Sequence, residues 1–84
     1  MTLSEKSVTL TAKQISDLNK KLSHMRHDIN NHLSLMIAAT ELIRRKPSTA
    51  EQMLDALNER PSKISESIAA FSKEFESLFG IQPN

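Results

Sequence analysis

The sequence has no cysteine, no tryptophan, no tyrosine and a single glycine among its 84 residues. Without cysteine no disulfide can brace the fold, and a chain of this size buries too little apolar surface to be stable without a brace or a partner. We therefore expect a partner chain. The scarcity of glycine and aromatic side chains, beside many Leu, Ile, Ala, Lys and Glu residues, disfavours sheet and predicts an all-α protein.

Neither sign of charge is in excess, because eleven Lys and Arg side chains stand against ten Asp and Glu. Proteins that bind nucleic acid or anionic membranes usually carry a marked basic excess. No apolar run approaches the roughly 20 residues of a membrane span, and the amino terminus has no signal-peptide pattern. We expect no nucleic-acid partner, no membrane contact by this segment and a cytoplasmic location, which is compatible with a membrane-anchored parent protein.

Two helices are predicted from start and stop signals. Thr11-Ala12-Lys13-Gln14 has the spacing of a capping box, which predicts a first helix over about 12–46 after a flexible leader at 1–10. Pro47 ends that helix, and Ser48-Thr49-Ala50-Glu51 is a second capping box that predicts a helix over about 49–79.

Two residues that disfavour helix, Pro61 and Gly80, lie within and just after the second predicted helix. Pro61 removes a backbone donor and crowds the preceding turn, so we expect a kink near 57–61, with two separate helices as the alternative. Gly80 supplies a left-handed cap, and residues 80–84 form the cap and tail. The helical-hairpin domain is thus predicted to span 11–79.

Apolar residues recur every seven positions in two adjacent rows of each predicted helix. In the first helix the rows are Ile15, Leu22, Ile29, Met36 and Ile43, and Leu18, Met25, His32 and Ala39. In the second they are Leu54, Pro61, Ile68 and Phe75, and Leu57, Ile64, Phe71 and Leu78. This repeat is typical of a bundle seam, and the short link predicts an antiparallel hairpin. Since two strips bury only part of each other, we expect two hairpins to form a homodimeric four-helix bundle.

The chemistry of the chain centres on His27, which lies opposite the apolar rows at the f position of the heptad and therefore faces water or a partner. Asn31 is four residues on and shares that face, while Asp28 is turned by about 100°. A neutral imidazole is nucleophilic near neutral pH. A carboxylate can hold its other ring nitrogen, and an amide can position a water. His27, Asp28 and Asn31 are the candidate catalytic residues.

Plainer interpretations stand beside this one. His27 and Asn31 could be ordinary solvent-facing residues, and Asp28 could pair with His24 or His32 at helical spacing. A metal shared by His24, His27 and Asp28 is disfavoured because a structural zinc takes four ligands, so we expect no metal site. His32 lies in an apolar row, which predicts a half-buried ring hydrogen-bonded across the bundle.

The segment His27-Asp28-Ile29-Asn30-Asn31-His32-Leu33 resembles the H-box of two-component sensor histidine kinases. The similarity to their dimerisation and histidine-phosphotransfer domain extends through the hairpin to Phe79. This resemblance implies that His27 is phosphorylated from ATP, that Asp28 assists, and that Asn31 helps to dephosphorylate the response regulator. It also implies three partners: a second copy, a response-regulator receiver domain, and an ATP-binding catalytic domain, in cis or in trans, that holds the ATP and Mg²⁺.

The sequence departs from that family at two positions. His32 stands where the family often has proline, which predicts that the usual bend after the phosphoacceptor is absent or displaced. Pro61 lies in the second helix, where it would move the bending point to the opposite arm.

Nothing in these residues resembles a nucleotide-binding domain, and one glycine cannot build a phosphate-cradling loop. Kinase activity would therefore need another domain, and we expect no cofactor in this chain. We favour an excised piece of a kinase over a stand-alone phosphorelay protein. The alternative from a different class is a non-catalytic coiled-coil hairpin that serves homodimerisation.

Overall fold

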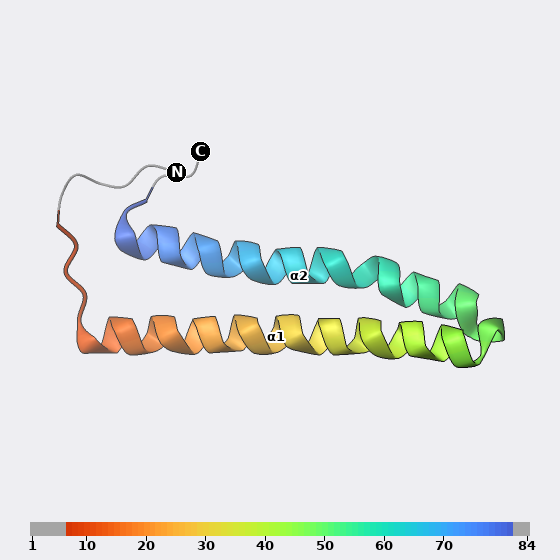
Figure 1. Cartoon of the computed structure of the whole chain (residues 1–84). Helices are drawn as coiled ribbons and strands as arrows, with labels where there is room; N and C mark the ends of the chain where they lie inside the picture. The colour runs from red at the N-terminus through yellow and green to blue at the C-terminus, as the bar shows by residue number, and fades with distance from the viewer. Residues whose placement is uncertain (1–6, 82–84) are drawn as a thin grey trace.

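The computed structural model describes residues 7–81, which form two long antiparallel helices (Figure 1). Helix α1 spans Ala12–Arg45, a 3₁₀ turn η1 spans Pro47–Thr49, and α2 spans Ala50–Phe79. The principal dimensions are 58 × 27 × 12 Å, so the molecule is a flat rod only two helices wide. The prediction of an all-α two-helix hairpin is confirmed. The predicted leader falls partly on residues 1–6 and the predicted tail on 82–84, which lie outside the described residues.

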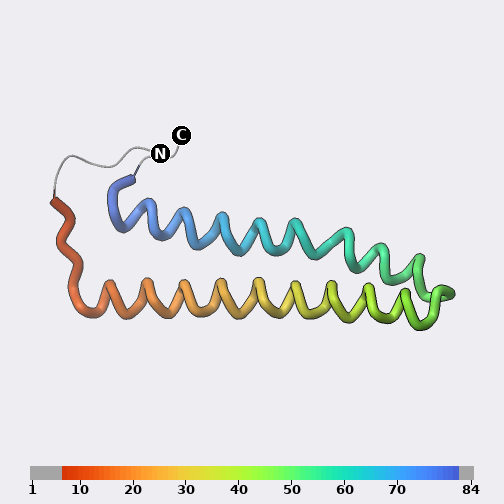
Figure 2. The backbone as a smooth tube through the Cα atoms, viewed as in Figure 1, coloured from red at the N-terminus to blue at the C-terminus, as the bar shows by residue number. Residues whose placement is uncertain are grey.

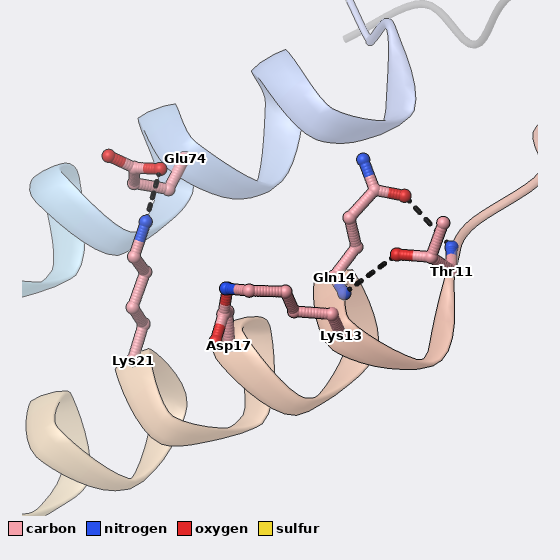
Figure 3. Close-up of polar contacts among 6 residues, drawn as sticks. All are labelled: Thr11, Lys13, Gln14, Asp17, Lys21 and Glu74. Carbon is pink, nitrogen blue, oxygen red and sulfur yellow. Dashed lines mark hydrogen bonds and ion pairs between the residues drawn. The ribbon is translucent and has the colours of Figure 1, made fainter.

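The predicted capping box at the start of α1 is confirmed. The backbone N–H of Gln14 donates to Thr11 Oγ1 at 3.1 Å, and the backbone N–H of Thr11 donates to Gln14 Oε1 at 2.9 Å (Figure 3). The two bonds satisfy donors that the first turn of a helix leaves without an intrahelical partner, and they fix the first helical residue as Ala12.

The predicted capping box at the start of α2 is wrong. Thr49, not Ser48, is the N-cap residue, and its side chain makes no capping hydrogen bond. Pro47 opens a 3₁₀ turn that continues directly into α2, so Thr49 has helical backbone angles of φ −89° and ψ −2°. In that conformation its hydroxyl instead donates back to the carbonyl of Lys46 at 2.8 Å. The helices accordingly end at Arg45 and begin at Ala50, one residue from the predicted bounds on each side.

The predicted left-handed cap at the end of α2 is confirmed. Gly80 has φ 65° and ψ 32°, a conformation that disfavours residues with a Cβ atom. The next backbone N–H, that of Ile81, donates to the carbonyl of Glu76 at 2.9 Å. The turn folds Ile81 back on the helix, where its side chain is only 8% exposed.

Pro61 lies inside α2, which remains one continuous helix. The alternative of two separate helices is therefore wrong. In Figure 2 the part of α2 nearer the turn slopes toward α1 more steeply than the rest, and the change falls in the segment coloured for residues near 60. Since proline provides no backbone N–H to the carbonyl four residues earlier, a change of direction at this place is expected.

Beside Ile29, Met36, Ile43 and Phe75, which are half-buried as well, the interior of the hairpin is formed by one of the two apolar rows on each helix. Its members are Leu18, Met25, His32 and Ala39 on α1 and Leu57, Ile64, Phe71 and Leu78 on α2, all half-buried except Ala39, which is buried. Phe75 packs against Phe71 and Phe79 with tilted rings, whose centroids are 6.1 and 4.6 Å away, and these three rings lie at the end of the hairpin far from the turn. Two helices thus bury few side chains fully.

Many large apolar side chains of the described residues remain exposed. They are Val8, Ile15, Leu22, Leu33, Leu35, Ile37, Leu42, Leu54 and Ile68. Ile15, Leu22, Leu54 and Ile68 each lie three residues before a member of the interior rows, an offset that in antiparallel helices points to the same face of the hairpin. Leu33 lies one turn after Ile29, which belongs to the row of Ile15 and Leu22, and Ile37 lies one turn after Leu33. We call Ile15, Leu22, Leu33, Ile37, Leu54 and Ile68 the apolar flank.

Candidate functional site

His27 lies near the middle of α1 with its side chain exposed. Met25 faces α2 and Leu22 lies on the apolar flank. The helical period therefore places the imidazole of His27 on the outside of the hairpin. Ser23, His24 and His27 line a shallow, open hollow on this outer surface. No described part of the chain covers the ring, which leaves the imidazole open to an incoming molecule.

Asn31 and Asp28 occupy different positions around His27. Asn31 is one turn further along α1, is exposed, and shares the outer surface with the imidazole. Asp28 is exposed on the flank opposite the apolar one, where it helps to line an open groove between the two helices. No hydrogen bond joins the side chains of His27, Asp28 and Asn31 in the arrangement seen for residues 7–81. The roles predicted for these three residues stay predictions.

The groove beside Asp28 has a volume of about 380 Å³ and mixed polarity. Its lining comprises Lys21, His24, Met25, Asp28, Glu66, Ser67, Ala70, Phe71 and Glu74. Lys21 Nζ on α1 donates to Glu74 Oε2 on α2 at 2.7 Å across one end of this groove (Figure 3). Both partners are more than half exposed, so the ion pair is worth little to stability. We call this side the grooved flank.

One further ion pair lies near the start of α1. Lys13 Nζ donates to Asp17 Oδ2 at 3.0 Å, and this hydrogen bond lowers the pKa of Asp17 below its usual value of 3.8, with a smaller contribution from the charge of Lys13 itself. The pair lies about three to four turns from His27, so it supports the helix rather than the candidate site.

The prediction for His32 is confirmed, because the ring is half-buried and hydrogen-bonded across the hairpin. Its Nδ1 lies 3.2 Å from Nη1 of Arg60 on α2. Sequence reasoning did not identify Arg60 as the partner. A signal was present, since Arg60 stands three residues after Leu57 and four before Ile64, both in the interior row.

Neither a metal centre nor a membrane-crossing helix is found among the residues that the structure describes. Within 7–81, no three His, Cys, Asp or Glu side chains gather closely enough to hold a metal ion. Over the same range, neither α1 nor α2 is apolar enough along its length to cross a bilayer. His24, His27 and Asp28 therefore do not form the three-ligand cluster weighed as an alternative.

Comparison with protein-family models, with curated proteins and with solved structures finds no match for this chain. The comparisons assign no family and no residue role. Evidence about function rests on the H-box-like segment from His27 to Leu33 and on where the fold places it.

Proposed function

We propose that this chain is the phosphoacceptor and dimerisation module of a two-component sensor histidine kinase. A separate catalytic domain that holds ATP and Mg²⁺ phosphorylates His27, and His27 passes the phosphoryl group to an aspartate of a response-regulator receiver domain. The observation that carries the proposal is the exposed imidazole of His27 at the middle of a long helix, inside a segment that resembles an H-box.

Two displacements at phosphorus make up the proposed reaction. A ring nitrogen of His27 attacks the γ-phosphorus of ATP, and a P–N bond forms as the P–O bond to ADP breaks. A carboxylate oxygen of the receiver aspartate then attacks the same phosphorus, and a P–O bond forms as the P–N bond breaks. In the first step the catalytic domain must reach the ring nitrogen, and in the second the receiver domain must reach the phosphorus bound to it. An exposed side chain at position 27 meets both requirements.

The neighbours of His27 have supporting roles in this proposal. Asp28 accepts the proton from the second ring nitrogen as phosphate arrives, and a rotation of its side chain would bring the carboxylate to the ring. Asn31 shares the outer surface with His27 and directs a water at the phosphorylated receiver, which gives the module a phosphatase activity. We place these reactions in the cytoplasm, where ATP is available.

Homodimerisation through the apolar flank is the second part of the proposal. The six large apolar side chains of this flank are exposed on the two helices, and exposed apolar side chains in this number favour a partner that covers them. A second copy related by a twofold axis would cover the flank with the same residues and complete a four-helix bundle. His27 lies on the outer side of α1 and stays accessible in such a dimer.

A non-catalytic hairpin that serves only homodimerisation is the second candidate. The exposed apolar residues favour it, because they call for a partner whether or not His27 reacts. A stand-alone phosphorelay protein, fed by another phosphoprotein, shares the chemistry of the first proposal and differs only in the phosphoryl donor.

The test combines the chain, its cognate ATP-binding catalytic domain supplied in trans, and ATP labelled at the γ-phosphate. The proposal predicts acid-labile label on the wild-type chain and on His24→Gln, and none on His27→Gln. His24→Gln is the matched control because it removes a second exposed imidazole one turn away on α1. Equal labelling of the wild type and His27→Gln would exclude His27 as the phosphoacceptor, and an unlabelled wild type would leave dimerisation alone as the function.

A further inference from the structure

The helix interface contains a polar pair among apolar side chains. His32 on α1 and Arg60 on α2 are both half-buried, and Arg60 Nη1 lies 3.2 Å from His32 Nδ1. The other hydrogen bond between side chains of the two helices, from Lys21 to Glu74, is solvent-exposed. These two are the side-chain hydrogen bonds that connect α1 with α2 within the described residues.

The direction of this bond follows from chemistry. A guanidinium group has five N–H donors and no acceptor, and it stays protonated in proteins. Arg60 Nη1 must therefore donate, and His32 Nδ1 must accept. This bond requires the tautomer of the imidazole that carries its proton on Nε2.

The pair does not satisfy the hydrogen-bonding capacity of the arginine. Arg60 Nε is buried and has no hydrogen-bond partner. Among the described residues no carboxylate lies within ion-pair distance of this guanidinium. A buried donor without a partner destabilises a fold, and a half-buried charge without a counter-charge adds to this cost. An apolar pair of similar volume at these two positions would be at least as stable.

Such a pair can exclude an alternative packing in which α1 is rotated and turns its other apolar row toward α2. The row of Ile15, Leu22, Ile29, Met36 and Ile43 is as apolar as the row of Leu18, Met25 and Ala39, and its last three members are half-buried as well. Hydrophobic burial alone therefore does not decide which row points more directly at α2. Only the second row carries His32, and Arg60 can reach the imidazole only when that row is inside.

We propose that the Arg60–His32 hydrogen bond fixes the rotational setting of α1 against α2, at the expense of stability. It selects the row of Leu18, Met25 and Ala39 for the interior and leaves Ile15 and Leu22 exposed on the apolar flank. Buried polar residues have this use in coiled coils, where they fix register while lowering stability. The inference concerns only the packing of one hairpin and does not depend on phosphoryl transfer by His27.

The test measures distances between spin labels on the two helices. Ser23 on α1 and Ser72 on α2 are exposed, and the chain has no cysteine, so Ser23→Cys with Ser72→Cys gives two unique attachment sites. Labelled chain is diluted with unlabelled chain so that distances within one hairpin dominate the pulsed electron paramagnetic resonance signal. A rotation of α1 moves the label on residue 23 and changes the distance.

With Arg60 and His32 present, we expect one narrow distance distribution. The double variant His32→Leu with Arg60→Leu should show a broader or two-component distribution, together with an unchanged or higher Tm. His32→Gln, whose side-chain oxygen can still accept from Arg60, should keep the narrow distribution. Lys21→Met with Glu74→Gln is the matched control, because it removes the exposed interhelical pair, and it should also keep the narrow distribution.

Three results would overturn the proposal. The first is a narrow, wild-type distribution in the double leucine variant, which would show that apolar packing alone sets the rotation. The second is equal broadening in the Lys21 and Glu74 control, which would mean that any interhelical polar contact has this effect. The third is a lower Tm or loss of helical structure in the double leucine variant, because the polar pair would then contribute stability rather than reduce it.

Discussion

The apolar flank and the outer surface of α1 are both exposed in the single hairpin, yet they differ in what they require. The apolar flank exposes hydrocarbon that a partner would remove from water, as at Leu22, Leu33 and Ile37. The outer surface exposes polar groups that already form hydrogen bonds with water, those of His24, His27 and Asn31. In the proposed function the same helix would therefore carry assembly on one side and chemistry on the other, and substitutions on one side should leave the other intact.

The largest expected effect comes from charging the apolar flank. Leu22→Glu with Leu33→Glu would place two carboxylates in the proposed dimer seam. Each substitution removes about 1.5–3 kcal/mol of stabilisation from leucine burial and adds the cost of desolvating a carboxylate. We expect the dimer dissociation constant to rise by at least about a hundredfold. Sedimentation equilibrium measures it, and Asn31→Glu, on the outer surface of α1 beside His27, is the control. A double variant that still sediments as a dimer would exclude this flank as the interface.

A much smaller effect is expected on the grooved flank, at the pair formed by Lys21 and Glu74. Because both side chains are more than half exposed, a double-mutant cycle with Lys21→Met and Glu74→Gln should give a coupling free energy of about 0.2–1 kcal/mol. Chemical denaturation at low and high salt measures it, and salt should reduce it. A coupling of several kcal/mol would mean that polar contacts, rather than apolar burial, hold the two helices together.

Asp17 is expected to contribute still less to the stability of the folded chain. The hydrogen bond from Lys13 lowers the pKa of Asp17 in the folded chain, so the folded state binds the proton less tightly than the unfolded state does. The stabilisation is therefore complete above the unfolded value of 3.8 and is lost as the pH falls through the lower folded value.

Asp17→Asn checks this pH dependence. The wild type should be slightly more stable than the variant at neutral pH, and the two should converge in acid well below the unfolded pKa. Thermal unfolding monitored by circular dichroism at both pH values measures the difference. A gap that persists unchanged in acid would assign the effect to something other than the ionised carboxylate.

The smallest expected effect on assembly is that of His27→Gln. The imidazole is exposed, so its replacement should change the free energy of unfolding by less than about 0.5 kcal/mol and leave the dimer dissociation constant unaltered. Denaturant unfolding and sedimentation measure the two quantities. If this variant fails to dimerise, the separation of assembly from chemistry on α1 is wrong.

Local signals in the sequence were enough to predict most of the hairpin. The cap residues Thr11 and Gly80 act through hydrogen bonds within one turn of helix, and each lies where its pattern indicated. Ser48 failed as a cap because Pro47 starts a 3₁₀ turn that runs straight into α2, and the spacing of a capping box does not reveal the backbone path before it.

Contacts between the two helices were harder to predict. The heptad rows predicted which residues could be inside, but they did not reveal that the row of Leu18 and Met25 would face α2 in preference to the row of Ile15 and Leu22. Arg60 was missed for the same reason, since its partner His32 is 28 residues away and no local pattern pairs them. The outward position of His27 was predictable because it depends only on helical period. Its reactivity is a question of chemistry that neither the period nor the fold decides.

Phosphorylation of the purified chain by phosphoramidate tests the central claim most directly, because this small donor transfers its phosphoryl group to histidine without a partner protein. Mass spectrometry of the digested product locates the group. The account predicts acid-labile phosphate on His27 in the wild type and in His24→Gln, and an unmodified chain for His27→Gln. Phosphate spread equally over His24, His27 and His32, or retained by His27→Gln, would contradict it.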